Sequence, residues 1–394
     1  MLADVYRPHI SGITNYIAVN KKYLEAAGHQ VYVFTFGDLD HQDEDNIIRS
    51  PGLPLIDTGY YLSFSYSRKA KALAQTMDIV HVHHPFLTGR LALRYCHPLR
   101  IPIVFTNHTR YDLYAQAYLP ILPEEFSDTF LQKYMPPFCD AVDLVVAPSA
   151  GMERILRHLG VTSNIIIIPN GVELHRFREN SKSPTRAELG FTSDDIILIY
   201  TGRLGPEKNI DFLIRAFSGV SDAVANANLV IIGSGPEMDN LRAVANQTGL
   251  SRKIHFLGFI NYDQLPAYLK IGDIFVTASV TEVHPLSVIE AMASGLPVMG
   301  VQSVGVGDTV DHGITGFLSR EDPAAFSALL TRLCLDTDLR KNMSRNAAGS
   351  VNKYSIEGTT SKMLSIYEEL VKGASTRRRG VGYQVRQLME KLRG

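Results

Sequence analysis

Short runs of hydrophobic residues alternate along this chain with longer stretches in which hydrophobic positions recur every three or four residues. The short runs are bounded by turn-forming residues, which is typical of buried parallel strands. The longer stretches have the period of amphipathic helices. The alternation predicts an α/β protein built from βα units on parallel sheets.

The predicted elements fall into two sets, separated by the turn-rich segment Pro169–Val172. Met1–Asp4 is expected to form only the last half of a first strand. The strands predicted after it in the first half are Gln30–Phe36, Asp78–His83, Ile101–Thr106, Leu144–Ala147 and Asn164–Ile168, with helices such as Thr14–Ala27 and Phe126–Cys139. Those of the second half are Ile196–Thr201, Asn228–Ile232, Ile254–Leu257, Ile274–Ala278 and Pro297–Gly300, with helices such as Ile210–Val220 and Met238–Thr248. We expect two doubly wound domains, residues 1–172 and 173–355, with ligands in the cleft between them.

Composition narrows the class of protein. The 394 residues are 45% hydrophobic and 20% charged, which is typical of a globular enzyme. The formal net charge of −1 gives no general electrostatic attraction for nucleic acid, so we expect no nucleic-acid partner. Three scattered cysteines fit a reducing, cytoplasmic compartment. We see neither a signal peptide nor an apolar run long enough to span a bilayer, so any membrane contact is expected to be peripheral.

Two glutamates eight positions apart, Glu282 and Glu290, are the most informative residues. The strand-like run before Glu282 and the helical run from about Leu286 place Glu282 in a strand-to-helix turn. The unpaired N–H groups of Leu286 and Ser287 would attract a phosphate at the helix start. Glu290 lies one turn further on, where its carboxylate can bind a ribose hydroxyl pair. Together these groups suit a nucleotide-sugar donor; a surface acid before an ordinary helix is the alternative.

A pair of cations precedes this segment in the chain. A predicted strand ends at Gly202, and Arg203 and Lys208 follow in a loop that enters a helix. A departing diphosphate gains negative charge, so fixed cations stabilise its transition state more than its ground state. Because these two cations can bind the diphosphate, we expect that no metal or other cofactor is required. The alternative is that both cations are solvated charges at a helix start.

These motifs resemble those of family 4 of the retaining glycosyltransferases, which have the GT-B fold of two Rossmann-like domains. The resemblance covers essentially the whole chain and rests on Glu282-x7-Glu290 and Gly202-Arg203-x4-Lys208. It implies that Arg203 and Lys208 hold the donor pyrophosphate and that Phe259 and Ile260 read the nucleobase edge. It also implies that Gly12 lets the backbone approach a phosphate, although Ile13 stands where the family has a second glycine. A helix at Ile356–Lys372 would return to the first domain, followed by a tail at residues 373–394.

The first domain supplies the candidate acceptor residues. The resemblance assigns His108 to the reacting centre, for positioning and charge stabilisation. His81, His83 and His84 invite a metal interpretation, but no third convergent ligand is evident, so we expect no metal and place His83 in the acceptor pocket. Aromatic residues crowd the following segment, as core packing or as an apolar acceptor groove. The acceptor residues predicted with His83 are Arg110, Tyr111 and Tyr114.

The form Glu282-Val283-His284-Pro285-Leu286 and the region around His108 resemble bacterial enzymes that glucosylate diacylglycerol; the commoner family form has Phe-Gly in place of His284-Pro285. We therefore predict transfer of a hexose from a nucleotide diphosphate sugar, with UDP-glucose and a lipid hydroxyl as the first choice. The tail alternates basic and apolar residues at helical spacing, as in a helix that binds an anionic membrane surface, or it is a solvated tail. The alternatives are a mannosyl- or galactosyltransferase of polysaccharide or lipid-linked oligosaccharide synthesis, a nucleotide-sugar epimerase on the same fold, and a sugar-nucleotide sensor.

Overall fold

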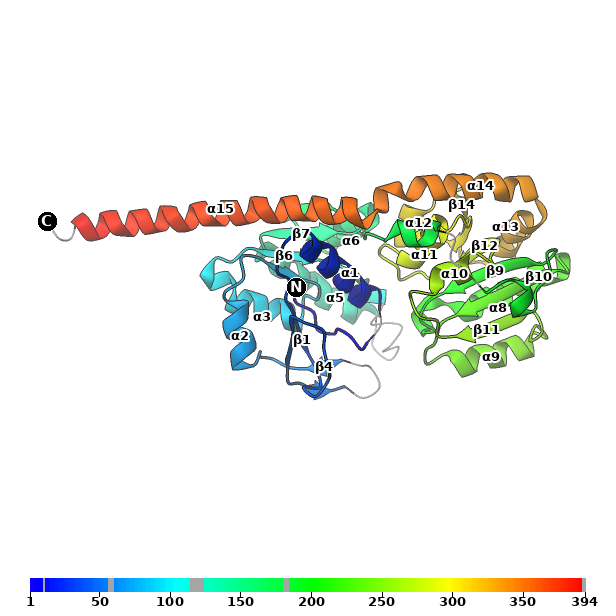
Figure 1. The fold of residues 1–394 in the computed structure, drawn as a ribbon, viewed down its shortest axis with the longest axis horizontal. Coiled ribbons are helices and arrows are strands. Elements are labelled where there is room, and N and C mark those ends of the chain that lie inside the picture. The colour runs from blue at the N-terminus through cyan, green and yellow to red at the C-terminus, as the bar shows by residue number, and fades with distance from the viewer. Residues whose placement is uncertain (10, 56–59, 114–123, 180–183, 392–394) are drawn as a thin grey trace. The chain divides into compact units, whose positions relative to one another are not determined.

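The computed structural model describes residues 1–9, 11–55, 60–113, 124–179 and 184–391 (Figure 1). The chain divides into two compact units. The first unit comprises residues 1–108, 128–169 and 357–394, and the second comprises residues 109–127 and 170–356. Residues 109–127 thus group with the second unit, whereas the sequence pattern placed them in the first.

The first unit contains a parallel sheet in which Leu2 supplies the central pairing. Leu2 bridges β1 (Val33–Phe36) on one side and β5 (Val80–Val82) on the other. β2 (Ile47–Ser50) pairs with β1, while β6 (Ile103–Thr106), β7 (Leu144–Ala147) and β8 (Ile165–Ile167) follow β5 in order. When Leu2 is counted as the first strand, the strand order is that of a doubly wound sheet. Successive strands are added first on one side of Leu2 and then, from β5 onward, on the other side. The predicted half-strand at Met1–Asp4 therefore has a structural counterpart at Leu2.

Helices and a small hairpin complete the first unit. The hairpin pairs β3 (Leu53–Pro54) with β4 (Tyr61–Leu62) in antiparallel register. The helices are α1 (Gly12–Ala26), α2 (Arg68–Ala74), α3 (Leu87–Tyr95), α5 (Glu124–Asp140) and α6 (Ala150–His158). Leu24 of α1 and Tyr367 of α15 pack in one apolar cluster with Val104 and Val146 of the sheet.

A single long helix, α15 (Ile356–Lys391), ends the described chain (Figure 1). Its residues from Glu357 onward belong to the first unit, so the helix carries the chain back from the second unit. Within the first unit, Tyr23 donates a hydrogen bond to Glu357 at 3.2 Å and Lys362 donates one to the carbonyl of Ile167 at 3.3 Å. The expected tail continues this helix as far as Lys391.

The second unit is a six-stranded parallel sheet in the order β11-β10-β9-β12-β13-β14 (Figure 1). The strands are β9 (Ile196–Thr201), β10 (Ala227–Ile232), β11 (Ile254–Gly258), β12 (Ile274–Thr277), β13 (Val298–Val301) and β14 (Gly316–Ser319). In order along the chain the sheet reads 3-2-1-4-5-6, the order of a dinucleotide-binding sheet. Its direction reverses between β9 and β12, and at such a point ligands bind outside the carboxyl ends of the strands.

Helices cover both faces of this sheet. The side chains of each strand point alternately to one face and the other, so each strand contributes to two apolar clusters. Leu198 and Tyr200 of β9 join a cluster with α8 (Ile210–Ala223), α9 (Met238–Gln247) and α13 (Pro323–Leu335). Ile197 and Ile199 join the opposite cluster. The helices that contribute to that second cluster are α7 (Leu174–Arg178), α10 (Leu265–Leu269), α11 (Leu286–Ala293), α12 (Val304–Thr309) and α14 (Thr337–Ser350).

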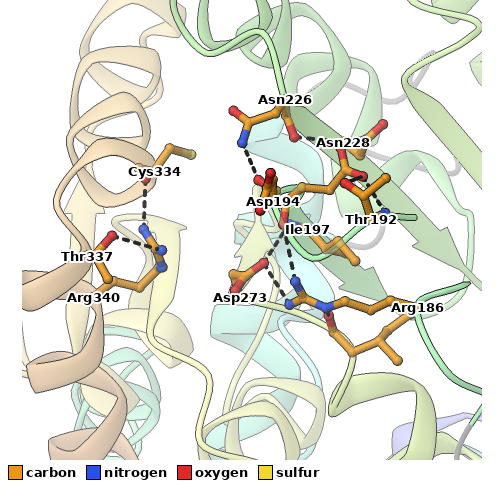
Figure 2. Close-up of polar contacts among 12 residues, drawn as sticks. Arg186, Thr192, Asp194, Ile197, Asn226, Asn228, Asp273, Cys334, Thr337 and Arg340 are labelled. Carbon is orange, nitrogen blue, oxygen red and sulfur yellow. Dashed lines mark hydrogen bonds and ion pairs between the residues drawn. The ribbon is translucent and has the colours of Figure 1, made fainter.

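Polar side chains stabilise the amino ends of strands β9 and β12. Figure 2 shows Arg186 reaching Asp273, with the two side chains 3.0 Å apart, while the same Asp273 oxygen accepts the N–H of Ile197 at 2.8 Å. Arg186 also donates to the carbonyl of Ile271 at 2.9 Å. These contacts lie at the amino ends of β9 and β12, so they hold the sheet from the side opposite the strand ends at which a ligand is expected.

Candidate functional site

The candidate donor site of the second unit is built from the two loops that flank the reversal point of its sheet. One loop leaves β9 at Gly202 and reaches Lys208 in a short 3₁₀ turn, Pro206–Lys208. The other leaves β12 and passes through Ser279 to Glu282 before α11 begins. The structure thus brings the two predicted motifs to the same edge of one sheet.

An ion pair joins these loops directly. The ammonium of Lys208 donates to the Oε1 atom of Glu282 at 2.6 Å, and the two side chains are 19% and 23% exposed. Burial alone would lower the pKa of Lys208, but Glu282, Tyr200 and Glu207 together outweigh it, so the pKa is raised above its ordinary value. Lys208 is therefore fully charged, and a cation and an anion lie in contact where a ligand could meet both.

Backbone contacts hold the two loops together beside this ion pair. The hydroxyls of Ser279 and Thr281 each donate to the carbonyl of Glu207 at 3.3 Å. On the other side, the N–H of Gly305 donates to the carbonyl of Glu282 at 3.0 Å. A Cβ on Gly305 would lie 2.5 Å from that same oxygen, so only glycine allows this approach. These supporting residues carry no motif and were not predicted.

The glycines after β9 and β10 serve the packing of the first loop. Gly202 and Gly233 have φ values of +155° and +143°, and a Cβ on Gly233 would lie 1.8 Å from the carbonyl oxygen of Gly202. A Cβ on Gly235 would lie 2.3 Å from the carbonyl oxygen of Leu204. The segment Gly233–Gly235 is therefore a tight turn against which the loop of Arg203 rests. Arg203 itself is partly buried, and its carbonyl accepts the hydroxyl of Tyr200 at 3.2 Å.

Helix α11 begins at Leu286 after Pro285, which makes no side-chain cap. The N–H groups of Leu286 and Ser287 belong to the first turn, where no carbonyl of the helix can accept them. Both residues are partly exposed. The predicted phosphate-binding amides are therefore located at an uncapped helix start immediately after Glu282.

His284 anchors this loop within the second unit. Its Nδ1 accepts the N–H of Asn170 at 3.3 Å, and its carbonyl accepts the Asn170 side chain at 3.0 Å. Its ring lies edge-on to Tyr354 at 4.9 Å. Burial lowers the pKa of His284 to about 3, so the imidazole is neutral and Nδ1 can accept a proton-bearing donor. This contact was not predicted, because Asn170 lies in a segment that was interpreted only as a turn.

Glu290 is buried on α11 and meets a tyrosine that was not predicted. The hydroxyl of Tyr262, in the segment after β11, donates to Oε1 of Glu290 at 2.8 Å. Burial raises the pKa of Glu290 to about 7, against the opposing effects of Tyr262 and Arg176. Gly258, the last residue of β11, has a φ of +73°; Phe259, directly after it, is 54% exposed, and Ile260 is partly buried. Phe259 therefore presents a surface on which a base could stack.

In the first unit, the reversal point lies between Leu2 and β5, and a histidine cluster follows. Nδ1 of His83 lies 3.0 Å from Nε2 of His108, and Nε2 of His81 lies 2.7 Å from the hydroxyl of Thr106. His83 has no exposed surface, so it can reach a ligand only through His108, which is partly exposed. Burial lowers the pKa of His108 to about 3, so His108 is a neutral imidazole. Tyr16 packs on His108, with ring centres 4.7 Å apart.

The remaining predicted loop of the first unit is the start of α1. Gly12 is the first residue of that helix, after the N-cap Ser11. The side chain of Ser11 accepts the N–H of Thr14, and Thr14 accepts the N–H of Ser11, which forms a capping box. A Cβ on Gly12 would meet nothing within 4 Å, so the helix start opens onto free space at this residue.

The predicted acceptor residues after β6 are only partly described. Arg110 forms a two-point contact with Asp112, with Nε at 2.9 Å and 3.1 Å from the two carboxylate oxygens. Tyr111 is partly buried, and Tyr114 lies outside the described residues. The guanidinium of Arg110 is thus oriented by Asp112, a residue that sequence reasoning did not select.

A ladder of stacked aromatic rings runs along α5. Tyr134 stacks on Phe130 at 5.6 Å and on Phe138 at 6.1 Å, and Phe86 stacks on Phe130 at 6.2 Å. Phe138 is buried, whereas Phe130 is 48% exposed. The inner end of the ladder is therefore core, whereas its outer end at Phe130 is an exposed apolar surface; an acceptor groove in this segment stays a prediction.

Across the described ranges of the chain, no group of three or more His, Cys, Asp or Glu side chains could hold a metal ion. Nor is any helix of those ranges both long enough and apolar enough to cross a membrane.

The fold and the paired loops define a glycosyltransferase of the GT-B class, and the comparisons agree. Residues 10–176 match the family described as Glycosyltransferase Family 4, and residues 181–350 match Glycosyl transferases group 1. The chain belongs to family 4 of the glycosyltransferases and is a hexosyltransferase.

Two curated relatives are alpha-monoglucosyldiacylglycerol synthases. The protein from Acholeplasma laidlawii is 28% identical over 94% of this chain and 96% of its own length. The protein from Streptococcus pneumoniae is 29% identical over 87% of this chain and 79% of its own. A D-inositol 3-phosphate glycosyltransferase from Corynebacterium jeikeium is 26% identical over 91% of this chain and 92% of its own.

Solved structures confirm the GT-B fold. Sucrose-phosphate synthase from Thermosynechococcus elongatus has a TM-score of 0.77 at 22% identity and covers 94% of this chain and 96% of its own. Anabaena HepE, solved with UDP and glucose, has a TM-score of 0.72 at 19% identity and covers 93% of this chain and 98% of its own. The predicted two-domain α/β architecture is therefore correct.

Proposed function

We propose that this enzyme transfers glucose from UDP-glucose to the hydroxyl of a diacylglycerol-type lipid, with retention of the anomeric configuration. The single observation that carries the donor half is the contact of Lys208 with Glu282, which unites a phosphate-binding cation and a sugar-binding carboxylate at one sheet edge. The lipid half is supported by the two glucosyldiacylglycerol synthases at 28% and 29% identity.

Each group of the donor site has a role in this proposal. Arg203 and Lys208 bind the diphosphate, together with the first amides of α11 at Leu286 and Ser287. Glu282 accepts hydrogen bonds from hydroxyls of the transferred sugar. Glu290 accepts them from the ribose.

The chemistry is an exchange at the anomeric carbon of the donor. The bond from that carbon to the diphosphate oxygen breaks, and a bond to the acceptor oxygen forms on the same face of the sugar. The acceptor proton moves to the departing phosphate oxygen, so no protein base is needed. Arg203 and Lys208 stabilise the charge that grows on the leaving diphosphate. His108, which is neutral, contributes a hydrogen bond and orientation, and His83 positions it.

The acceptor proposal uses Phe130 of the first unit, Arg110 and Tyr111 of the segment that groups with the second unit, and the basic end of α15. The exposed edge of Phe130 offers an apolar surface that suits an acyl chain, and Arg110 and Tyr111 supply polar groups for a hydroxyl-bearing headgroup. Arg377, Arg378 and Arg379 are carried by α15, whose sequence suits peripheral binding to anionic lipid. We place the enzyme in the cytoplasm, at the inner face of the membrane. We propose that neither a metal nor any other cofactor takes part.

A second candidate acceptor is a soluble phosphorylated polyol. It is favoured by the relatives named D-inositol 3-phosphate glycosyltransferases, of which one matches 91% of this chain. A mannosyl- or galactosyltransferase of polysaccharide synthesis remains the wider alternative, and an epimerase is the least favoured because it would need no acceptor.

The test is a product assay on the full chain. Radiolabelled UDP-glucose, UDP-galactose and GDP-mannose are each incubated with diacylglycerol vesicles or with inositol 3-phosphate, and label is followed into the lipid and aqueous phases. Glucose in the lipid phase alone supports the proposal. Label in the polyol fraction supports the second candidate, and interconverted UDP-sugar without any transfer supports the epimerase.

A further inference from the structure

One described side chain holds the carboxylate of Glu290, and it comes from a different element. Glu290 is 5% exposed on α11, and its Oε1 accepts the hydroxyl of Tyr262 at 2.8 Å. Among the residues that the structure describes, Tyr262 is the single hydrogen-bond donor to this carboxylate. The second oxygen is therefore left for another donor.

Tyr262 is in turn held by the helix that follows the connection between the two units. The guanidinium of Arg176, on α7, lies over the Tyr262 ring at 5.1 Å from its centre. Phe177, also on α7, packs against the edge of the same ring at 6.1 Å. A cation over a phenol ring is attracted to its face and makes its hydroxyl a better donor.

Arg176 is itself fixed on both sides. It contacts Glu173 at 3.1 Å and also pairs with Asp263, the neighbour of Tyr262. Glu173 is 2% exposed, so this is a firmly seated ion pair. The groups that face Glu290 are thus Tyr262 and Arg176, with Glu173 and Asp263 balancing the charge of the guanidinium.

The electrostatics of Glu290 fit this arrangement. Burial raises its pKa to about 7, while the hydrogen bond from Tyr262 and the charge of Arg176 lower the pKa. Without these two groups, burial would keep the carboxyl protonated at neutral pH. An ionised carboxylate accepts hydrogen bonds at both oxygens, whereas a protonated one must donate from one of them.

We propose that Tyr262, held in place by Arg176, is a positioning residue that occupies one oxygen of Glu290 and leaves the other for the ribose hydroxyls of the donor. The inference rests on the proposed function, in which Glu290 binds the ribose. It adds that preference for ribose over 2′-deoxyribose depends on Tyr262 and varies with pH near neutrality.

The test measures binding of UDP and 2′-deoxy-UDP to the full chain by calorimetry, on both sides of neutral pH. In the wild type the preference for UDP should rise with pH through about 7, because Glu290 ionises there. In Tyr262→Phe, loss of a bond to a charged group should displace this rise upward by about one pH unit. The preference at neutral pH should fall several-fold. Titration of the UDP phosphates is common to both proteins and cancels in the comparison.

Tyr268→Phe is the matched control. Tyr268 lies on α10, six positions from Tyr262, and packs against the same apolar cluster. In the described part of the chain no hydrogen bond joins Tyr268 to Glu290, so removal of its hydroxyl should leave the preference unchanged. Arg176→Met should shift the rise in the same direction as Tyr262→Phe, by less.

The outcomes separate this inference from the proposed function. A Tyr262→Phe curve that coincides with the wild type overturns the positioning role while leaving UDP as the donor nucleotide. Failure of the wild type to bind UDP at any pH overturns the proposed donor and, with it, this inference.

Discussion

The ammonium of Lys208 and the carboxylate of Glu282 are in contact at 2.6 Å, although 74 positions of sequence separate them. Lys208 lies in the loop after β9 and Glu282 in the loop after β12, so the pair spans the point at which the strand order reverses. Each group balances the charge of the other. A nucleotide sugar that binds there would offer phosphate to the lysine and hydroxyls to the glutamate.

Removing the lysine charge should impair turnover far more than folding. In Lys208→Met we expect kcat to fall by about two to three orders of magnitude, as for loss of one transition-state contact. The thermal midpoint should change little, because Glu282 is 23% exposed and can be hydrated. Lys341→Met, at an exposed position of α14, is the control. A kcat of Lys208→Met close to that of the wild type would remove the diphosphate clamp from the mechanism.

Replacing His284 by phenylalanine should loosen the donor loop. The buried N–H of Asn170 would lose its acceptor, which costs about 1–3 kcal/mol. We expect a lower thermal midpoint and a raised KM for the donor, measured by calorimetry and steady-state kinetics. His312→Phe is a matched control, because His312 also accepts a backbone N–H, at 3.0 Å, but is exposed. Equal losses in the two variants would argue against a special role for His284.

The buried histidines should make the fold sensitive to acid. Burial lowers the pKa values of His81, His83, His108 and His284, and it lowers those of His108 and His284 to about 3. Below the ordinary histidine pKa of about 6.5, the unfolded chain binds protons that these side chains cannot bind in the folded state. Stability should therefore fall as pH decreases from about 6.5 toward 3, by up to about 1.4 kcal/mol per pH unit for each histidine.

Urea unfolding at a series of pH values measures this slope. In His108→Asn this slope of stability with pH should be smaller by the contribution of one histidine. A free energy of unfolding that is flat between neutral pH and mild acid would contradict the neutral, buried state of the cluster.

The basic end of α15 should govern membrane binding. Neutralising Arg377, Arg378 and Arg379 to glutamine should weaken binding to anionic vesicles by about 1 kcal/mol per residue at low salt. High salt should remove most of the difference. Vesicle flotation measures it, and truncation before Thr376 should have at least the effect of the triple variant. Salt-independent binding that survives truncation would exclude this helix as the membrane contact.

The sequence predicted the strands of both sheets wherever four or more consecutive residues are buried. β7 and β9 are examples, because their continuous apolar runs are bounded by turns. β2 was missed because Arg49 and Ser50 interrupt its apolar pattern, and β14 because it begins at a glycine and ends at a serine. The hairpin of β3 and β4 has two residues in each strand, too few to show a period.

Only those residues of the site that belong to a motif could be predicted from the sequence. Arg203, Lys208, Glu282 and Glu290 stand at spacings that have a chemical meaning. The residues that support them stand at no such spacing: Tyr262 and Glu290 are 28 positions apart, and Asn170 and His284 are 114 positions apart. Such contacts arise from the packing of α11 against neighbouring elements, and no local pattern encodes them.

The most direct test of the central claim is UDP release from UDP-glucose by the full chain, with and without diacylglycerol vesicles, beside Lys208→Met. We expect release that requires the lipid and that is nearly lost in the variant. Release that is independent of lipid and equally fast in Lys208→Met would contradict both the acceptor and the donor site described above.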